Sequence, residues 1–578
     1  MLTRRRVVSA VVVFLLAAVA WTAWLAFQTA RDLRTAERAV DRIRAAIATD
    51  DIAARTEAIE DLAEASRKAK ARTAGVWWSG LTWAPMIGDD IGGVKDLSES
   101  LDLLARRAFV PLGDTLDSLD SVVAGGRVDV DRLEALTPRV SAAHAAFEGA
   151  AQVVGERDSS GFAGPLKSRF REYVSEVSKA AADLSSAEDA IAVLPTLLGG
   201  DGPRQYLFVF ENNAEIRATG GLPGSWALVK ANDGQLTMAK QGNAADFDVY
   251  TEPIGGITVA EADLFGKEMG RFFQDPNFTP DFPRAAQVFD AFWTRQFPRL
   301  PIDGVVSVDT IALSYLLEAT GPVQVQDLTL TSSNVVDSLL RDVYEEPVTA
   351  KQNEVFRNVA RTIFDTITTD LEDPLELLTG IARATSEGRF RMAAFDQEVN
   401  ERLSETRVAG ELSGDLGKVP SVDIALNDAT ASKMSYYLRY RSEVQSLSCS
   451  GEVQRLAATV TLSQIISPSE ARSLPPYVTG GGPAGANPGS QFVRVHVIAP
   501  FAGSIGDVKI DGASVGTPQV VTFNGRPAIT LAVLIDSLQD VLITFEMETG
   551  PGQTQDGVLE STPSVLPGEN VKYFSSSC

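Results

Sequence analysis

Apolar residues recur every three or four positions in the first third of the chain, which is the spacing of one face of an α-helix. Charged residues are dense between them. The spacing predicts a long helical stalk or bundle over residues 28–198, after an N-terminal segment of residues 1–27. The apolar positions are Leu33, Ala36, Val40, Ile43, Ile47, Ile59, Leu62 and Ala65, and glycine or proline predicts helix breaks at 75, 85–88, 125–126 and 161–165.

Three tryptophans, Trp77, Trp78 and Trp83, flank a glycine and a proline inside this helical region. Large aromatic side chains at a helix break either close the end of a bundle or meet lipid headgroups or a lipid-linked substrate. Packing at the bundle end is the favoured interpretation, and lipid contact is the alternative.

The pattern changes at Gly199, where short β-like runs begin to alternate with helical ones. This alternation predicts an α/β domain with a mixed, helix-covered sheet over residues 199–430. The hairpin signal Asn232-Asp233-Gly234 separates two of its strands. The predicted strands are 206–210, 226–230, 236–239, 303–309 and 389–395, and the predicted helices are 285–296, 310–319, 334–343 and 351–368.

The last quarter of the chain shows strands separated by turns, with Asp511-Gly512 and Asn524-Gly525 typical of hairpins. This pattern predicts a C-terminal β-sandwich domain over residues 431–578. Its predicted strands include 436–444, 453–462, 492–498, 520–524, 528–534 and 541–547.

The N-terminus indicates the compartment. Arg4-Arg5-Arg6 precedes an uncharged apolar run at residues 7–27, long enough to cross a bilayer as a helix of about 20 residues. Under the positive-inside rule, the arginines keep the N-terminus cytoplasmic and place the rest of the chain outside the cell membrane, as a signal-anchor does. Trp21 and Trp24 stand near the outer end, where aromatic belts form. The alternative is a signal peptide cleaved after Ala18-Val-Ala20.

Charge and histidine content exclude several function classes. The formal net charge of −24 repels nucleic acid, so an anionic ligand would need a local basic pocket or a bridging cation. The two histidines, His144 and His496, stand in unrelated contexts. They argue against a Ser/His/Asp triad and against a histidine-ligated zinc site.

The two cysteines, Cys449 and Cys578, agree with an exported location. Two thiols in an oxidising compartment are expected to pair, with two free thiols as the alternative. The bridge would pin the C-terminus to the start of its domain.

Residues 211–226, ENNAEIRATGGLPGSW, join two predicted strands and hold more polar and flexible residues than the two to five that a hairpin needs. The surplus predicts a site, the floor of an anion-binding cleft, where a guanidinium and glycine backbone meet a ligand. In the alternatives, Arg217 only braces the loop against Glu215 or Glu211, the asparagines cap a turn, and the glycines supply positive φ. The candidate ligand-binding residues are Asn212, Asn213, Glu215, Arg217, Gly220 and Gly221.

Three strings carry a family resemblance: Tyr206-Leu207 with NNAEIRATGG at 212–221, DGV at 303–305, and LLEATGPV at 316–323. On these strings the chain resembles a bacterial cell-envelope family called domain of unknown function 4012. The resemblance implies the envelope as the site of action and implies no activity.

The order of landmarks also resembles, more distantly, the LytR-CpsA-Psr phosphotransferases of cell wall biogenesis. Those proteins are anchored by one N-terminal helix and move a glycopolymer from a polyprenyl-pyrophosphate lipid to peptidoglycan. The resemblance implies a divalent cation, for which Mg²⁺ is the expected ion, and a pyrophosphate contact from Arg217. Further basic contacts would come from Lys351, Arg357 and Arg361. Metal carboxylates would come from Asp246 and Asp248, with Asp275 and Asp281 nearby in sequence.

The chain departs from that second pattern. Thr219 stands where the phosphotransferases have an aspartate, and Lys351-Gln352-Asn353 replaces an arginine-rich helix. Because fold does not imply function, two hypotheses stand. One is an envelope-assembly protein that binds, or also transfers, a lipid-linked glycopolymer precursor. The other is a non-catalytic scaffold or ligand-binding protein with a degenerate phosphotransferase-like domain.

One structural observation separates the two hypotheses. Two or more arginines converging on an apolar tunnel would favour the first. A cleft without basic residues, beside an exposed apolar patch on the β-domain, would favour the second.

Overall fold

The computed structural model describes residues 2–49, 51–85, 87–113, 122–124, 126–344, 349–369, 371, 373–404, 406–480, 487–516 and 518–578. The chain forms two units by its contacts. The first comprises residues 1–122 and 131–192, and the second comprises residues 123–130 and 193–578.

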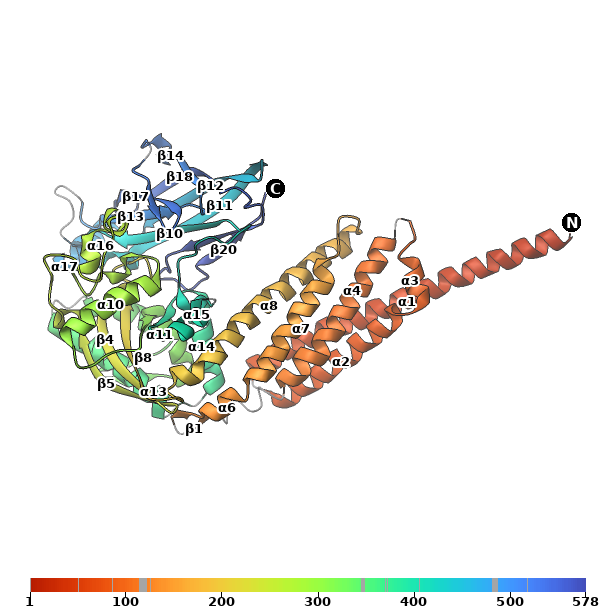
Figure 1. The fold of residues 1–578 in the computed structure, drawn as a ribbon, viewed down its shortest axis with the longest axis horizontal. Helices are drawn as coiled ribbons and strands as arrows, with labels where there is room; N and C mark the ends of the chain where they lie inside the picture. The colour runs from red at the N-terminus through yellow and green to blue at the C-terminus, as the bar shows by residue number, and fades with distance from the viewer. Residues whose placement is uncertain are drawn as a thin grey trace. The chain divides into compact units, whose positions relative to one another are not determined.

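The first unit is helical, as the three-and-four spacing predicts (Figure 1). Its elements are α1 (Leu2–Ala48), α2 (Ile52–Thr73), α3 (Val76–Leu81), α4 (Gly88–Leu104), the π-helical turn η1 (Ala105–Phe109), α6 (Val130–Glu134), α7 (Thr137–Gly155) and α8 (Gly164–Leu197). Ala36, Ala39 and Ile43 of α1 pack against Ala58 and Leu62 of α2. Small side chains on both faces let the two helices approach closely.

The predicted membrane anchor lies within α1. The side chains of residues 2–16 and of residue 19, which form much of the apolar run at 7–27, lie outside the described residues. Among the residues that are described, no helix combines the length and apolar character that crossing a bilayer requires.

A seven-stranded mixed sheet is the centre of the second unit. β3 pairs in parallel with β6, and the neighbouring strand pairs β3–β4, β4–β5 and β6–β9 are antiparallel. The mixed α/β class that the sequence predicts is therefore confirmed. In sheet order the strands are β1 (Val123–Ala124), β2 (Arg127–Val128), β5 (Gln235–Asn243), β4 (Leu222–Asn232), β3 (Arg204–Asn212), β6 (Gly304–Asp309) and β9 (Phe390–Ala394).

The strands β1 and β2 lie in a stretch that the sequence assigns to the helical region. Each is two residues long, too short to show a period of its own. Arg127 of β2 pairs with Gln235 of β5 in register and forms an ion pair with Asp233. These contacts attach the hairpin to the edge of the central sheet.

Helices cover both faces of the central sheet. Along β3, Leu207 and Val209 belong to a core with Phe289 of α10 on one face. Tyr206 belongs to a second core, with Ile311 of α11. This alternation follows from the two-residue period of a strand and gives three layers. The elements around the sheet are η2 (Ala244–Asp246), α9 (Val259–Leu264), η3 (Lys267–Gly270), η4 (Pro276–Phe278), α10 (Phe282–Gln296), α11 (Thr310–Thr320), β7 (Val323–Val325), β8 (Leu328–Leu330), α12 (Val335–Leu340), η5 (Asp342–Tyr344), α13 (Thr349–Thr369), α14 (Pro374–Ser386), α15 (Gln397–Ser404) and η6 (Arg407–Ala409).

The C-terminal part of the second unit is β-rich, with two further sheets. Val495 and Leu531 of one sheet share a single core with Val460 and Ile543 of the other. The first sheet is ordered β16 (Val521–Phe523), β17 (Arg526–Ile535), β13 (Gln491–Ile498), β10 (Ser421–Asp428), β19 (Gly557–Ser561) and β20 (Val571–Phe574). The second is ordered β11 (Leu438–Ser450), β12 (Val453–Gln464), β18 (Asp540–Glu548), β14 (Ser504–Ile510) and β15 (Ala513–Ser514), and η7 (Met434–Tyr437), α16 (Pro468–Ser473) and α17 (Pro476–Thr479) lie between strands.

The strand β10 differs from the sequence-based boundary. It lies before residue 431, in the segment assigned to the α/β domain, yet it pairs with β13 and β19. Its eight residues are all buried, so they lack the alternation that marks a half-exposed strand.

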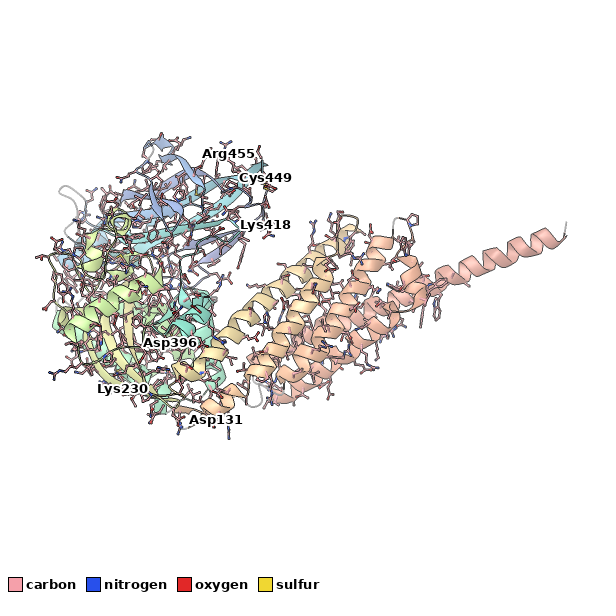
Figure 2. The ribbon with its side chains drawn as sticks, viewed as in Figure 1. Asp131, Lys230, Asp396, Lys418, Cys449 and Arg455 are labelled. Atoms are coloured by element: carbon pink, nitrogen blue, oxygen red, sulfur yellow. A yellow bond between two sulfur atoms is a disulfide. The ribbon has the colours of Figure 1, made fainter. Side chains whose placement is uncertain are left out.

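A disulfide joins Cys449 of β11 to Cys578, as the sequence predicts; Cys449 is labelled in Figure 2. The two cysteines are 129 positions apart in sequence. Beside them, the Ser577 N–H and hydroxyl donate to Ser446 Oγ and Ser446 O. The C-terminal residues are therefore held to β11 by hydrogen bonds as well as by the bridge.

We expect Cys578→Ser to lower the free energy of unfolding of the second unit. In the chain-entropy model a loop of this length contributes about 5 kcal/mol, which is the upper bound for the loss. Urea unfolding of the wild type, Cys578→Ser and the exposed control Ser575→Ala measures it. Two alkylatable thiols in native exported protein would contradict the pairing.

Candidate ligand-binding pocket

The connection between β3 and β4, residues 213–221, is buried against the C-terminal sheets. Ile216 belongs to their core, and its N–H donates to Ser435 Oγ (3.1 Å). The Ala218 N–H donates to Asn427 Oδ1 (2.9 Å). Because these backbone groups find partners in the protein itself, the connection is packed against the C-terminal sheets.

The two glycines of this connection serve its packing. Gly220 has φ of +137°, in the region that favours glycine. A Cβ on Gly221 would lie 2.4 Å from the carbonyl carbon of Asn212. The close backbone approach that the glycines allow is therefore made to the neighbouring strand.

Arg217 is buried in an ion pair with an acid from a different loop. Its Nη2 lies 3.2 Å from Asp275 Oδ1, its Nη1 donates to Ile216 O, and its guanidinium stands 4.7 Å from the centre of the Phe278 ring. Burial raises the pKa of Asp275 to about 6, against the opposite effect of the Arg217 charge. The bracing alternative expected a partner in Glu215 or Glu211, and the observed partner is Asp275.

Glu215 pairs instead with Lys433, whose Nζ contacts Glu215 Oε1. The Lys433 ammonium also lies 5.0 Å from the centre of the Tyr344 ring. Tyr344 in turn accepts a hydrogen bond from Asn212 Nδ2. These side chains form a polar cluster at the end of β3.

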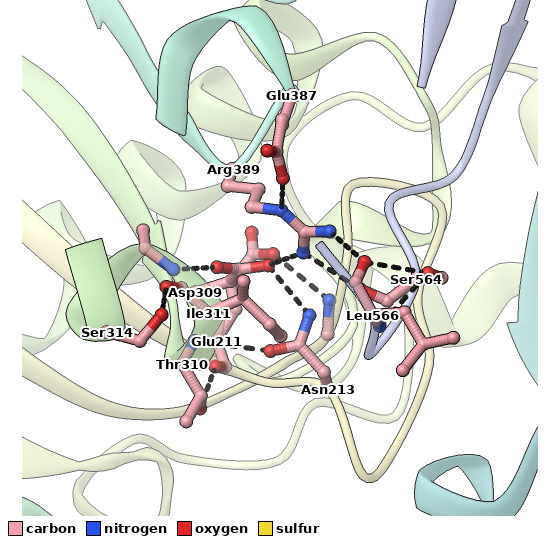
Figure 3. A network of polar contacts seen from close by, with 12 residues as sticks. Glu211, Asn213, Asp309, Thr310, Ile311, Ser314, Glu387, Arg389, Ser564 and Leu566 are labelled. Carbon is pink, nitrogen blue, oxygen red and sulfur yellow. Dashed lines mark hydrogen bonds and ion pairs between the residues drawn. The ribbon is translucent and has the colours of Figure 1, made fainter. Parts of the chain in front are cut away.

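A largely buried network of polar contacts is centred on Asp309 and Arg389 (Figure 3). Asp309, at the end of β6, accepts hydrogen bonds from Asn213 Nδ2 (2.9 Å) and Arg389 Nη1 (2.8 Å). Arg389 also donates to Glu387 Oε2 (2.6 Å) and to the carbonyl oxygen of Leu566 (2.6 Å). Asn213 is thus a structural partner of Asp309 in this network.

Glu211 is a buried carboxyl with four donors around it. Ser307 Oγ and Thr219 Oγ1 donate to its Oε1 at 2.5 and 2.9 Å, Asn277 Nδ2 lies 3.3 Å from the same atom, and the Gly221 N–H donates to Oε2 at 3.1 Å. Burial raises the pKa of Glu211 to about 7, although the Arg391 charge and these hydroxyls oppose the rise.

A pocket of about 220 Å³ opens between the ends of β3, β4 and β6 and the helices α11 and α13. Its lining consists of apolar side chains on one part, which we call the apolar wall, and polar side chains on the rest. The apolar side chains are Phe210, Leu222, Ala244, Ala245, Val308, Leu313, Leu339, Phe356, Val359 and Ala360. The polar ones are Glu211, Asn212, Glu215, Ser225, Asn243, Gln274, Asp309, Thr310, Tyr344, Gln352 and Lys433.

Of the predicted ligand-binding residues, the structure places Asn212 and Glu215 in this pocket. The other four stand elsewhere: Asn213 contacts Asp309, Arg217 contacts Asp275, and Gly220 and Gly221 lie in the packed connection.

The three basic residues of α13 that were predicted as secondary ligand contacts do not line the pocket in the described structure. The side chain of Lys351 lies outside the described residues, Arg357 is half-buried, and Arg361 is exposed. The α13 side chains that do line the pocket are Gln352, Phe356, Val359 and Ala360.

The predicted metal carboxylates are not gathered into a site. Asp246 accepts a hydrogen bond from the Asn243 N–H (2.7 Å) in a capping box, and Asp248 is exposed. Over the described residues, no group of three or more histidine, cysteine, aspartate or glutamate side chains is arranged to hold a metal ion.

Sequence reasoning missed Lys433, Tyr344 and Asp309 as pocket residues. Asp309 carried a usable signal, since it is a charged residue at the end of a fully buried strand. Lys433 and Tyr344 carried none, because nothing local relates them to residues 211–215. Lys433 is 218 positions from the glutamate that it contacts.

The comparisons with known proteins agree with the first resemblance. A family model described as a protein of unknown function, DUF4012, matches residues 201–344. This segment begins just before β3 and ends at Tyr344, so it contains the β3–β4 connection. No curated protein matches the chain. Neither comparison supports the more distant resemblance to the LytR-CpsA-Psr phosphotransferases.

We expect Arg217→Ala to destabilise the second unit by about 3–5 kcal/mol, because it leaves the Asp275 carboxyl buried without its partner. A double-mutant cycle with Asp275→Ala should show strong coupling, while the cycle with Glu215→Ala should be close to additive. Urea unfolding supplies both values. Coupling to Glu215 instead of Asp275 would contradict the observed pairing.

We expect Glu211 to make stability depend on pH in a defined direction. Its folded pKa of about 7 lies above its ordinary value of 4.5, so the folded state retains a proton that the unfolded state releases. Stability from this group is present below pH 4.5 and is lost as pH rises towards 7, by up to about 3 kcal/mol.

The measurement is urea unfolding between pH 4.5 and 8. Other titrating groups contribute equally to the wild type and to Glu211→Gln. The informative quantity is therefore the difference between their free energies of unfolding at each pH. The exposed control Glu252→Gln should follow the wild type. Parallel curves for wild type and Glu211→Gln would refute the assignment.

Proposed function

We propose that this chain is a membrane-anchored, extracytoplasmic binding protein of the cell envelope, whose pocket holds one end of an amphiphilic ligand with a neutral, hydroxyl-bearing head. The sugar end of a lipid-linked glycopolymer precursor is a head of this kind, whereas the pyrophosphate that joins sugar to lipid in such a precursor is not. The observation that carries the proposal is the pocket lining, which joins an apolar wall to a polar group with a single basic side chain among the described residues, Lys433.

The charges around the pocket favour a neutral head over a pyrophosphate. Glu211, Glu215 and Asp309 line it, and Lys433 is already paired with Glu215. A pyrophosphate is best held by guanidinium forks, and the lining that the structure describes contains no arginine. Carboxylate and amide groups can instead accept or donate hydrogen bonds to sugar hydroxyls.

The arginines nearby are committed to buried acids. Arg217 pairs with Asp275, and Arg389 pairs with Asp309 and Glu387. Releasing either one to a ligand would leave a buried carboxylate unpaired, which costs several kcal/mol. This supports ligand binding without phosphoryl transfer, the second of the two functions that the sequence allows.

The size of the pocket limits how much ligand it holds. At about 220 Å³ it is smaller than the roughly 300–1,000 Å³ typical of small-molecule sites. It fits a short alkyl segment with one adjoining ring and leaves the remainder of a long lipid or glycan outside.

The proposed location rests on the N-terminal sequence and on the disulfide. Arg4-Arg5-Arg6 before an apolar run at residues 7–27 is typical of a signal-anchor, and a disulfide is typical of an oxidising compartment. The shared core of the two C-terminal sheets supports a β-sandwich that packs against the α/β domain.

We expect hexyl glucoside to bind the full chain and raise its melting temperature. Hexyl phosphate should bind at least about tenfold more weakly, because Lys433, the one basic side chain described in the lining, is already paired with Glu215. Isothermal titration below micelle concentrations compares them. Ala360→Trp should fill the pocket and abolish glucoside binding. The exposed control on the same helix, Asp365→Trp, should preserve it.

Two results would overturn the proposal. Tighter binding of hexyl phosphate than of hexyl glucoside would indicate a site for anionic heads. Glucoside binding that survives Ala360→Trp, with the fold intact by circular dichroism, would place the ligand outside this pocket.

A further inference from the structure

The segment between α2 and α4, which contains α3, exposes large apolar side chains although part of it packs against the bundle. Val76 is 91% exposed and Trp83 is 89% exposed. Between them, Trp78 is buried, and its Nε1–H donates to the carbonyl oxygen of Ile91 (3.1 Å). Trp78 therefore closes the end of the bundle, as the favoured interpretation of the tryptophans expects, and leaves its neighbours outside.

One hydrogen bond sets the level of this segment along α1. The Trp77 Nε1–H donates to Thr22 Oγ1 (3.1 Å). Around Thr22, the rings of Trp21 and Trp24 stack with their centres 5.0 Å apart, and both are about half exposed. Two segments more than fifty residues apart thus present aromatic side chains at one level of the same helix.

We call the exposed large apolar side chains of these two segments the aromatic collar. Five of them are aromatic, and the members are Trp21, Trp24, Phe27, Val76, Trp77 and Trp83. α1 continues past the collar towards the N-terminus as one unbroken helix (Figure 1).

We propose that the aromatic collar lies in the headgroup layer of a lipid bilayer, on the side where the helical unit stands, and so fixes this unit at the membrane surface. The inference rests on the proposed anchor in α1 and adds a second contact, from α3 and the turn after it, that the anchor alone does not require. The partner is a bilayer surface of ordinary phospholipid.

The dimensions of α1 agree with this placement. From Val7 to Trp24 the helix rises about 26 Å at 1.5 Å per residue, close to the hydrocarbon thickness of about 30 Å. Arg4-Arg5-Arg6 then lies at one face of the bilayer and the collar at the other. Tryptophan favours this interface, because its ring is apolar and its N–H can reach a polar partner.

A collar at the surface also explains why exposed tryptophans are tolerated. If the bundle were surrounded by water, Val76 and Trp83 would keep their apolar surface exposed and would contribute no hydrophobic stabilisation. In the headgroup layer the same side chains leave water without any change in the fold of the bundle.

The test uses the full chain, reconstituted in phosphatidylcholine vesicles whose acyl chains carry bromine close to the headgroups. Bromine quenches tryptophan emission at short range. The chain has seven tryptophans, so the test starts from the variant Trp21→Phe/Trp24→Phe. In this variant the remaining exposed tryptophans are Trp77 and Trp83, and the buried ones are Trp78, Trp226 and Trp293.

We expect brominated vesicles to quench this variant, and we expect the further change Trp83→Phe to lower the quenching and to leave the part that Trp77 contributes. A chain that floats with the vesicles but shows no quenching in the Trp21→Phe/Trp24→Phe variant would refute the collar and leave the anchor standing. A wild-type chain that does not float with the vesicles would overturn the anchor and the collar together. Circular dichroism verifies that each variant keeps its helical content.

Discussion

The buried ion pair between Asp309 and Arg389 is the interaction on which the second unit depends. Both side chains are almost completely shielded from water, and a charge in such a place is tolerated only when its partner and further hydrogen bonds are present. Asp309 also caps α11 through the Ala312 N–H (2.7 Å). Arg389 reaches Ser564 O and Leu566 O in the C-terminal segment. One pair therefore holds the end of the central sheet, the start of a helix and a segment that adjoins β19.

This constraint explains the unusual composition of the β3–β4 connection. Asn213 completes the hydrogen bonding of Asp309, and Thr219 and Gly221 complete that of Glu211. The polar residues between the two strands are thus the seam between the central sheet and the C-terminal sheets. A seam that buries backbone as well as side chains needs a donor or acceptor at nearly every position, which accounts for the many polar residues.

The polarity of the pocket is set by side chains at the end of β3 that do not take part in the seam. The end of β3 gives Asn212 and Glu215 to the pocket side, where Lys433 and Tyr344 meet them. Lys433, Arg217 and Arg389 are already paired with acids, so the described part of the pocket offers hydrogen bonds and apolar contact more than positive charge. The acidic overall charge of the chain acts in the same direction. These features make an anionic head a poor match and a hydroxylated one a good match.

Local pattern accounts well for the regular elements of the fold. The three-and-four spacing of the N-terminal region, the buried strand before Asp309 and the helices at 310–319 and 351–368 correspond to α1, β6, α11 and α13. Each depends on residues that are close in sequence. The two-residue strands β1 and β2 and the fully buried β10 escaped detection because they have no period that distinguishes them.

The order of the helical, α/β and β-rich regions and the pairing of the two cysteines follow from the sequence, and so does the expectation that residues 211–226 have a role beyond that of a turn. Which partners these residues contact depends on the tertiary structure. Arg217 could have met Glu215, Glu211 or a ligand, and folding placed it against Asp275, 58 positions away. Lys433, 218 positions from Glu215, became its partner. Such pairings depend on which strands and helices pack together, and no local spacing of residues encodes that choice.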